Sequence, residues 1–219
     1  MASLVRNILI LGPQGSGKGT QAGLLAGKLK LAHIETGKMF RRMAKRSTPL
    51  GRRINRIMNE KGKLIPDALA NRILWQALKK VRRSQGIVFD GFPRTLAQAR
   101  TLDRLMKRLG RQITLVINMP ISRRTTIRRL SLRRTCDRCG RIFIAGKNIS
   151  PRRVTCPVCG GKIFQREDDK PAAIAGRLAA YRILTKPVIR YYRDRHVLLT
   201  VDGEPPVQAV FKNILKLFT

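Results

Sequence analysis

Residues 12–20 read Gly-Pro-Gln-Gly-Ser-Gly-Lys-Gly-Thr and directly follow the apolar run Leu4–Leu11. A buried strand, a glycine-rich loop and a helix start in this order predict a phosphate-binding site. The loop aims several backbone N–H groups at one anion, and the helix adds the positive end of its dipole. The spacing fits G-x-x-x-x-G-K through Lys18, but Gly19 stands where serine or threonine is usual, with Thr20 next. A glycine-rich turn without a ligand is the alternative, which the strand, the lysine and the spacing together disfavour.

The net charge of the chain is extreme. Lysine and arginine number 47 against 12 acidic residues, which gives +35. At most 12 basic side chains can each have a carboxylate of their own, so most of them face solvent or a polyanion. Two interpretations stay open: nonspecific binding of RNA or DNA, or an adaptation of solubility that involves no partner. Because such a surface repels itself, we expect stability to rise with added salt or phosphate.

Length and hydropathy indicate a folded cytoplasmic protein. A chain of 219 residues with 43% hydrophobic content can bury a core. No apolar run approaches the roughly 20 residues that a membrane-spanning helix needs. The glycine-rich loop follows the N-terminus so closely that no removable signal segment fits before it. We therefore expect a soluble protein without a membrane partner.

Short apolar runs alternate with helical patterns along most of the chain. Runs rich in β-branched residues predict buried parallel strands at Val5–Leu11, Leu31–Ile34, Ile87–Phe89, Ile113–Ile117 and Val197–Val201. Helical spacing predicts helices at Gln21–Lys30, Asp67–Val81, Leu96–Leu109 and Ala172–Tyr192. This alternation is typical of an α/β doubly wound domain. Segments 35–66 and 130–169 interrupt it, and we expect each to form a small inserted subdomain over the carboxyl edge of the sheet.

A second strand-to-loop junction occurs at residues 87–94, Ile-Val-Phe-Asp-Gly-Phe-Pro-Arg. Asp90 ends the apolar run. An acid at the end of a strand that lies beside a phosphate loop is well placed to hold Mg²⁺, directly or through water. Capping of the next helix is the alternative role for Asp90, and the loop at 12–20 favours magnesium.

All four cysteines fall into one arrangement. Two C-x2-C pairs are separated by sixteen residues, and a glycine follows each pair: Cys136, Cys139, Cys156 and Cys159. This is the spacing of a zinc site with four thiolates, which has no open position and is therefore structural. Two disulfides are the alternative, which the glycine knuckles and a cytoplasmic setting disfavour. We expect Zn²⁺ to staple an insert too small to bury a core of its own.

These motifs together resemble the adenylate kinase family of nucleoside monophosphate kinases, in its long-lid form with a four-cysteine zinc site. The resemblance runs nearly end to end, and its most specific segment is Asp90-Gly91-Phe92-Pro93-Arg94-Thr95. The other matching segments are Gly12–Thr20 with Gln21, Glu35-Thr36-Gly37, Gln98, Arg133-Arg134, Gln165–Asp169, Arg177-Leu178-x-x-Tyr181, Pro187, Tyr191-Tyr192 and Asp202-Gly203.

The resemblance implies the reversible reaction in which MgATP and AMP become two ADP. It implies a P-loop NTPase-type parallel five-stranded sheet flanked by helices. The core would comprise residues 1–34, 67–131 and 170–219, with an AMP-binding insert at 35–66 and a zinc-containing lid at 132–169. We expect the protein to be a monomer.

The resemblance also assigns site residues. The ATP phosphates would be held by Gly15, Ser16, Gly17, Lys18, Gly19 and Thr20, with Arg129 on the donor adenine and Arg133 also contacting ATP. AMP would be bound by Thr36, Arg41, Lys63, Leu64, Ile65, Gly91, Arg94, Gln98, Arg166 and Arg177. The catalytic set would be Lys18, Arg94, Arg133, Arg166 and Arg177, with Asp168 and Asp169 positioning the arginines. Such a set suits phosphoryl transfer, which needs alignment and charge neutralisation, because a guanidinium forks onto two phosphate oxygens.

Five positions depart from the family pattern. Glu35 replaces a serine, Lys38 an aspartate, Leu132 a glycine, Ile144 a lid histidine and Gln14 a loop proline. None of them removes a residue assigned to phosphate chemistry. We expect the departures to affect the rate of the reaction and not its type.

Two other functions stay open at this stage. A nucleic-acid-binding zinc module on an ATP-binding core would use the +35 charge, although 5% aromatic content leaves few platforms on which bases could stack. A monophosphate kinase acting on UMP or CMP is the other. Gln98 can form a paired hydrogen bond with adenine, and Thr36 indicates adenine over guanine in the family.

Overall fold

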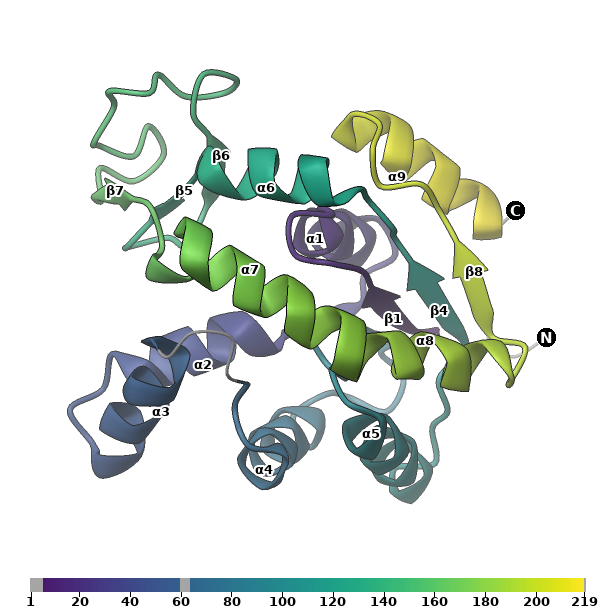
Figure 1. Ribbon diagram of the computed structural model, residues 1–219. Helices are drawn as coiled ribbons and strands as arrows, with labels where there is room; N and C mark the ends of the chain where they lie inside the picture. The colour runs from purple at the N-terminus through teal and green to yellow at the C-terminus, as the bar shows by residue number, and fades with distance from the viewer. Residues whose placement is uncertain (1–5, 60–63, 219) are drawn as a thin grey trace.

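A parallel sheet lies at the centre of the molecule (Figure 1). The computed structural model describes residues 6–59 and 64–218. The sheet has five strands in the order β2-β3-β1-β4-β8, and neighbouring strands are parallel throughout. Their bounds are β1 (Asn7–Leu11), β2 (Ala32–Glu35), β3 (Ile87–Asp90), β4 (Leu115–Asn118) and β8 (Leu198–Thr200). The predicted α/β fold with a five-stranded sheet is confirmed.

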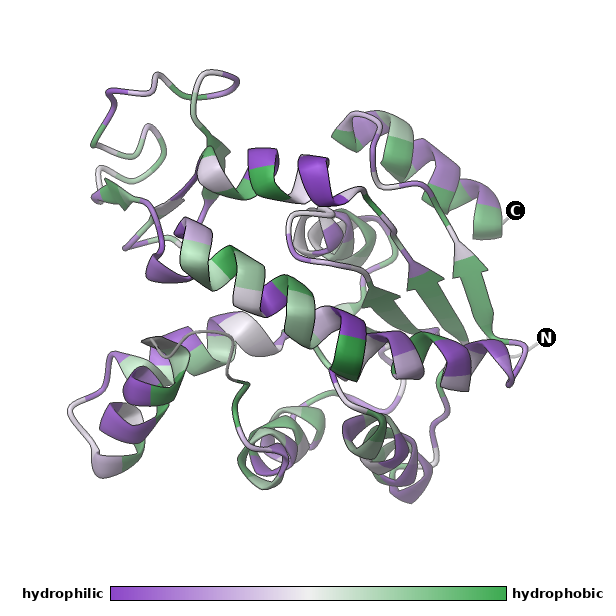
Figure 2. Cartoon of the chain, viewed as in Figure 1, coloured by the Kyte–Doolittle hydropathy of each residue, from purple (hydrophilic) through white to green (hydrophobic). Residues whose placement is uncertain are grey.

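Both faces of the three central strands, β3, β1 and β4, are covered, which explains why these strands are apolar without alternation. In β1, Ile8 and Ile10 pack in the cluster formed with helices α1 (Lys18–Lys28) and α9 (Val207–Leu215). Leu9 and Leu11 point the other way, into the larger cluster formed with helices from the opposite face. Those helices are α4 (Asp67–Leu78), α5 (Leu96–Arg108) and α8 (Lys186–Arg193). Figure 2 shows hydrophobic strands and helices with mixed surfaces around them.

The predicted elements occur within a few residues of their expected bounds, with one exception. The helix expected at Ala172–Tyr192 consists of α7 (Pro171–Ala180), a π-helical turn (Tyr181–Thr185) and α8. The sequence pattern does not distinguish these three, because their backbones run on in nearly helical geometry. Helix α6 (Arg123–Ser131), α9 and a short 3-10 segment (Lys216–Phe218) complete the core.

Two excursions leave the sheet at its carboxyl edge. The first carries helices α2 (Thr36–Ala44) and α3 (Pro49–Asn59). The second carries an antiparallel sheet in the order β6-β5-β7, followed by a 3-10 turn. Its elements are β5 (Arg133–Cys136), β6 (Ile142–Ile144), β7 (Ile163–Phe164) and the turn Glu167–Asp169.

The two excursions touch one another. The Nζ atom of Lys45, just after α2, donates a hydrogen bond of 2.9 Å to the carbonyl oxygen of Asp137 in the first cysteine knuckle. Helix α3 also contacts the turn Glu167–Asp169. Within the described part of the chain, no helix is both long enough and apolar enough to cross a bilayer.

Candidate active site

The glycine-rich loop connects β1 to α1 and wraps around Lys18. Gly17 takes a left-handed backbone (φ 87°) immediately before α1, a conformation that glycine adopts without strain. The Nζ atom of Lys18 donates a 3.0 Å hydrogen bond to the carbonyl oxygen of Pro13, so the side chain folds back along the loop. The hydroxyl of Ser16 is buried and has no hydrogen-bond partner among the described residues. The loop therefore holds one cation and two polar atoms that the described chain leaves unsatisfied, Ser16 Oγ and Gln14 Oε1, beside the N-terminus of a helix.

A cavity opens in front of this loop, and cationic side chains from distant elements surround it. Lys18 of α1, Arg94 after β3, Arg133 of β5 and Arg177 of α7 line it together with Gln14 and Gly15 of the loop. Burial lowers the pKa of Lys18 to about 8, and the three arginines add to that shift while Asp90 opposes it. Burial lowers the pKa of Arg94 to about 10, with Arg177 contributing. A polyanion entering the cavity would offset this crowding of positive charge.

Asp90 explains the glycine that departs from the usual loop pattern. The carboxyl group of Asp90 is buried at the end of β3, and Asp90 lies in register with Ile10 of β1. A Cβ atom added at Gly19 would lie 2.8 Å from the Oδ2 atom of Asp90. A serine or threonine at position 19 would therefore displace the carboxylate. Ligand atoms of His33, Glu35 and Asp90 all lie within 4.8 Å of one another.

The acidic run in the second excursion binds arginines. Asp169 is 0% exposed and accepts a 2.7 Å hydrogen bond from Nε of Arg133 and a second from its Nη2. Nη1 of Arg177 lies 3.3 Å from Oδ1 of Asp169 and 3.1 Å from Oδ2 of Asp168, and it donates to the Asp168 carbonyl at 2.8 Å. The two carboxylates thus hold an arginine from β5 and an arginine from α7 side by side.

Arg166 lies at the base of the same cluster. Its Nε atom donates a 2.8 Å hydrogen bond to Oγ1 of Thr135. Burial, together with the charges of Arg133 and Arg41, lowers the pKa of Arg166 to about 9. Burial works to raise the pKa of Asp168, but Arg177 and its neighbouring arginines outweigh it and hold that pKa below its usual value.

A second cavity adjoins the first. Gly91, Phe92, Arg94 and Arg177 line both of them. The remaining walls of the second cavity come from Gly37, Phe40, Arg41, Met58, Leu64, Ile65, Ala70, Gln98, Glu167, Asp168 and Ala173. Arg94 and Arg177 therefore lie between two cavities, one next to the phosphate loop and one beside α2 and α3.

Most of the residues expected to bind the second nucleotide surround this second cavity. Thr36 is buried, and its hydroxyl donates a 3.3 Å hydrogen bond to the carbonyl oxygen of Asp90. Nη2 of Arg41 forms a 3.1 Å ion pair with Glu35. Leu64 and Ile65 form part of the wall, whereas Lys63 lies outside the described residues.

Gln98 is held by hydrogen bonds at both ends of its amide. The hydroxyl oxygen of Thr95 caps α5 by accepting from the backbone N–H of Gln98 at 3.1 Å. The Oε1 atom of Gln98 accepts from the backbone N–H of Arg94 at 2.8 Å, and its Nε2 donates to Asp67 at 2.7 Å. Sequence reasoning missed Asp67, and the available signal was an acid at the first position of a predicted helix.

Arg129 and Thr185 occupy positions that sequence reasoning described differently or missed. The guanidinium of Arg129 donates to the carbonyl oxygens of Gly15, Gly203 and Glu204 at 2.7–3.2 Å. These bonds tie the phosphate loop to the turn after β8. The hydroxyl of Thr185, in the π-helical turn, donates to the Arg94 carbonyl at 3.0 Å.

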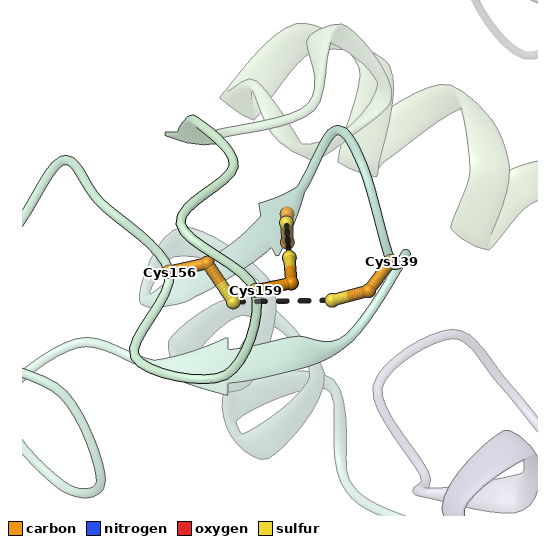
Figure 3. Close-up of side chains that lie close together, drawn as sticks. Cys139, Cys156 and Cys159 are labelled. Atoms are coloured by element: carbon orange, nitrogen blue, oxygen red, sulfur yellow. Dashed lines mark hydrogen bonds between the residues drawn. The ribbon is translucent and has the colours of Figure 1, made fainter.

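The four cysteines converge at the tip of the second excursion. Figure 3 shows Cys139, Cys156 and Cys159 directed toward one another from two knuckles. The sulfurs of Cys136 and Cys159 are 3.5 Å apart, those of Cys139 and Cys156 are 3.8 Å apart, and all four lie within 4.8 Å of one another. All four thiols are free, so the disulfide alternative does not hold. A tetrahedral ion with bonds of about 2.3 Å needs sulfurs about 3.8 Å apart, so the cluster fits Zn²⁺.

Comparison with known proteins gives one consistent result. The model of the adenylate kinase family matches residues 10–197. An adenylate kinase of Thermosipho melanesiensis is 41% identical over 213 residues, covering 96% of this chain and 98% of that protein. An adenylate kinase of Archaeoglobus fulgidus is 38% identical over 208 residues, covering 95% of each. An adenylate kinase of Lachnospira eligens is 39% identical over 210 residues, covering 96% of this chain and 98% of that protein.

Proposed function

The chain belongs to the adenylate kinase family and reversibly transfers a phosphoryl group from MgATP to AMP to give two ADP, and from this premise we propose how its residues divide the work. The cavity beside the phosphate loop holds the ATP phosphates. The cavity under α2 and α3 holds AMP. The observation that supports this division most is the set of shared wall residues, since Arg94 and Arg177 face both cavities where the two phosphate chains would meet.

On the donor side, the backbone of Gly15–Thr20 cradles the ATP phosphates and Lys18 contacts them as a point charge. The unpartnered hydroxyl of buried Ser16 supports this role, because a phosphate oxygen can accept from it. The flat face of the Arg129 guanidinium packs on the donor adenine. Asp90 holds the Mg²⁺ that accompanies ATP through water, and the ion, when bound, neutralises charge on the phosphate oxygens.

On the acceptor side, Arg41 and Arg94 bind the AMP phosphate and Gln98 hydrogen-bonds the adenine. Thr36, Gly91, Leu64 and Ile65 complete the pocket, with Arg166 and Arg177 contributing from the side of residues 132–169. In this arrangement Glu35 is paired with Arg41. The AMP phosphate therefore competes with that carboxylate for Arg41.

Arg133, Arg166 and Arg177 neutralise the charge that spreads over the transferring phosphoryl group. Asp168 and Asp169 hold two of these guanidiniums in place before substrate arrives, so that little reorganisation remains for the reaction itself. Closure of residues 132–169 as a lid excludes water, which would otherwise accept the phosphoryl group.

Zn²⁺ is the metal that we propose for the cysteine cluster, in a structural role. The buried residues of this excursion form a cluster of their own, made of Cys136, Phe143, Ile149, Cys156 and Ile163. So small a core needs additional stabilisation. A Zn²⁺ ion bound by four thiolates provides it and has no open coordination position. The division into a core of 1–34, 67–131 and 170–219, an insert of 35–66 and a lid of 132–169 is part of the same proposal.

Turnover with a panel of acceptors tests these assignments. We expect ADP formation from MgATP with AMP to exceed that with UMP, CMP or GMP. We expect Arg94→Ala to raise the KM for AMP much more than the Kd for MgATP. A preference for a pyrimidine acceptor would contradict the role of Gln98, and equal losses at both substrates would contradict the placement of Arg94.

The net charge favours a second, independent activity, the nonspecific binding of RNA or DNA through the outer surface. A charge of +35 leaves many more bases than acids to pair with. Retention of a labelled single-stranded RNA at low salt, with the affinity falling steeply as salt rises, would support it. A monomeric state and a cytoplasmic location stay predictions.

A further inference from the structure

The side-chain amide of Gln98 lies between two groups with opposite hydrogen-bonding character. On one side is the backbone N–H of Arg94, which can only donate, 2.8 Å from Oε1. On the other is the carboxylate of Asp67, which accepts from Nε2 at 2.7 Å. Both neighbours favour the same orientation of the amide, with oxygen toward Arg94 and nitrogen toward Asp67, and each contributes part of the free energy that holds it.

This amide cannot be reversed without loss at both ends. Turning it by 180° would place Nε2 against the Arg94 N–H and Oε1 against the Asp67 carboxylate, which is two donors facing and two acceptors facing. Gln98 is 3% exposed, so water cannot easily relieve either clash. Asp67 is itself fixed, because its second carboxylate oxygen accepts a 2.9 Å hydrogen bond from the Thr95 hydroxyl.

The locked amide keeps one N–H and one oxygen lone pair for a ligand, in a fixed order. A 6-amino purine presents an amino donor beside the acceptor N1, which matches an oxygen and an N–H in one orientation only. A 6-oxo purine presents a carbonyl acceptor beside an N1–H donor, which matches only the reversed amide. A freely rotating glutamine would pair with either base.

We propose that Asp67 is a specificity-determining positioning residue, which selects 6-amino over 6-oxo purine monophosphates by fixing the orientation of the Gln98 amide. This inference rests on the proposed contact of Gln98 with the acceptor base. Asp67 does not line the cavity itself. It begins α4, only two positions after the wall residue Ile65, and so joins that wall to the N-terminus of α5.

The test compares AMP with IMP, which differ at the purine 6-position and N1 but share the ribose and phosphate. We expect Asp67→Ala to reduce the ratio of kcat/KM for AMP to that for IMP by about tenfold, the value of a hydrogen bond to a charged group. The ratio does not depend on how much of the variant is folded, since both substrates report on the same active molecules. A merely structural role for Asp67 would lower both efficiencies together and leave the ratio unchanged, which would overturn the proposal.

Two further variants make the result specific. Asp103→Ala removes another carboxylate of α5, which accepts from the hydroxyls of Tyr191 and Tyr192 and shares no hydrogen-bond partner with Gln98. We expect it to leave the ratio unchanged, and an equal drop would refute the role of Asp67. Gln98→Ala tests the premise. If it also fails to change the ratio, the base contact of Gln98 is wrong, whereas a collapse of the ratio in Gln98→Ala but not in Asp67→Ala overturns only the inference about Asp67.

Discussion

Asp169 is the side chain whose conservative replacement should reveal most about how Arg133 and Arg177 work. It is fully buried and accepts from Nε and Nη2 of Arg133, while Arg177 Nη1 lies 3.3 Å away. In Asp169→Asn the shape is retained. The amide has a single oxygen acceptor and presents an NH₂ group to at least one of the two guanidiniums.

The size of the effect follows from these contacts. A hydrogen bond to a charged group contributes about 1.5–3 kcal/mol, and the substitution removes at least one of them together with the negative charge between two cations. Taking the loss as about 3 kcal/mol, and 1.36 kcal/mol for each factor of ten, gives about a 150-fold decrease in kcat/KM. We expect most of the decrease in kcat, because the arginines act mainly on the transferring group.

The assay is a coupled measurement of ADP formation at saturating MgATP and AMP, with the melting temperature recorded on the same samples. Asp194→Asn is the matched control. Asp194 also pairs with an arginine, Arg190, but its side chain is 66% exposed and it lines neither cavity, so its loss should change kcat less than twofold. If Asp169→Asn is folded and keeps kcat within threefold of the unsubstituted protein, the positioning role of Asp169 is wrong.

Three more outcomes follow from the geometry. Lys18 is charged below its pKa of about 8 and neutral above it, so the affinity for MgATP should fall as pH rises from 7 to 9.5. If the Kd measured by calorimetry stays constant over this range, Lys18 does not contact the phosphates. Glu35→Ser removes the counter-ion of Arg41 and should lower the KM for AMP about threefold, the scale of a partly exposed ion pair, while an unchanged or raised KM would show that Glu35 does not compete with AMP. Chelation of the metal should lower the melting temperature and leave the initial rate at low temperature unchanged, and immediate loss of turnover in a protein that is still folded would argue against a structural metal.

Much of the core could be predicted because its strands are buried on both faces. Val88, Phe89 and their neighbours form apolar runs that only a covered parallel strand explains. The cysteine cluster followed from spacing, since two knuckles of fixed geometry can close on one ion. In both cases a pattern within a short stretch of sequence is enough to predict the structure.

The elements that escaped prediction depend on contacts across the chain. Strands β6 and β7 have two or three residues, too few for any periodicity. Helix α6 is rich in arginine, so its buried residues Thr125, Thr126 and Leu130 do not stand out as an apolar face. Asp67 acquires its role only because the N-termini of α4 and α5 meet, 28 residues apart in sequence at Thr95.

The π-helical turn fixes how far α8 is rotated about the helix axis relative to α7, which it joins end to end. Arg177 of α7 binds Asp168 and Asp169. Tyr191 and Tyr192 of α8 donate hydrogen bonds to Asp103. One residue corresponds to about 100° of rotation in an α-helix. If the segment Tyr181–Thr185 were one residue shorter, α7 and α8 could not both keep their contacts. With the tyrosines of α8 bound to Asp103, Arg177 would point away from its carboxylates. The length of the π-helical turn therefore couples the position of Arg177 at the site to the packing of α8 on the core.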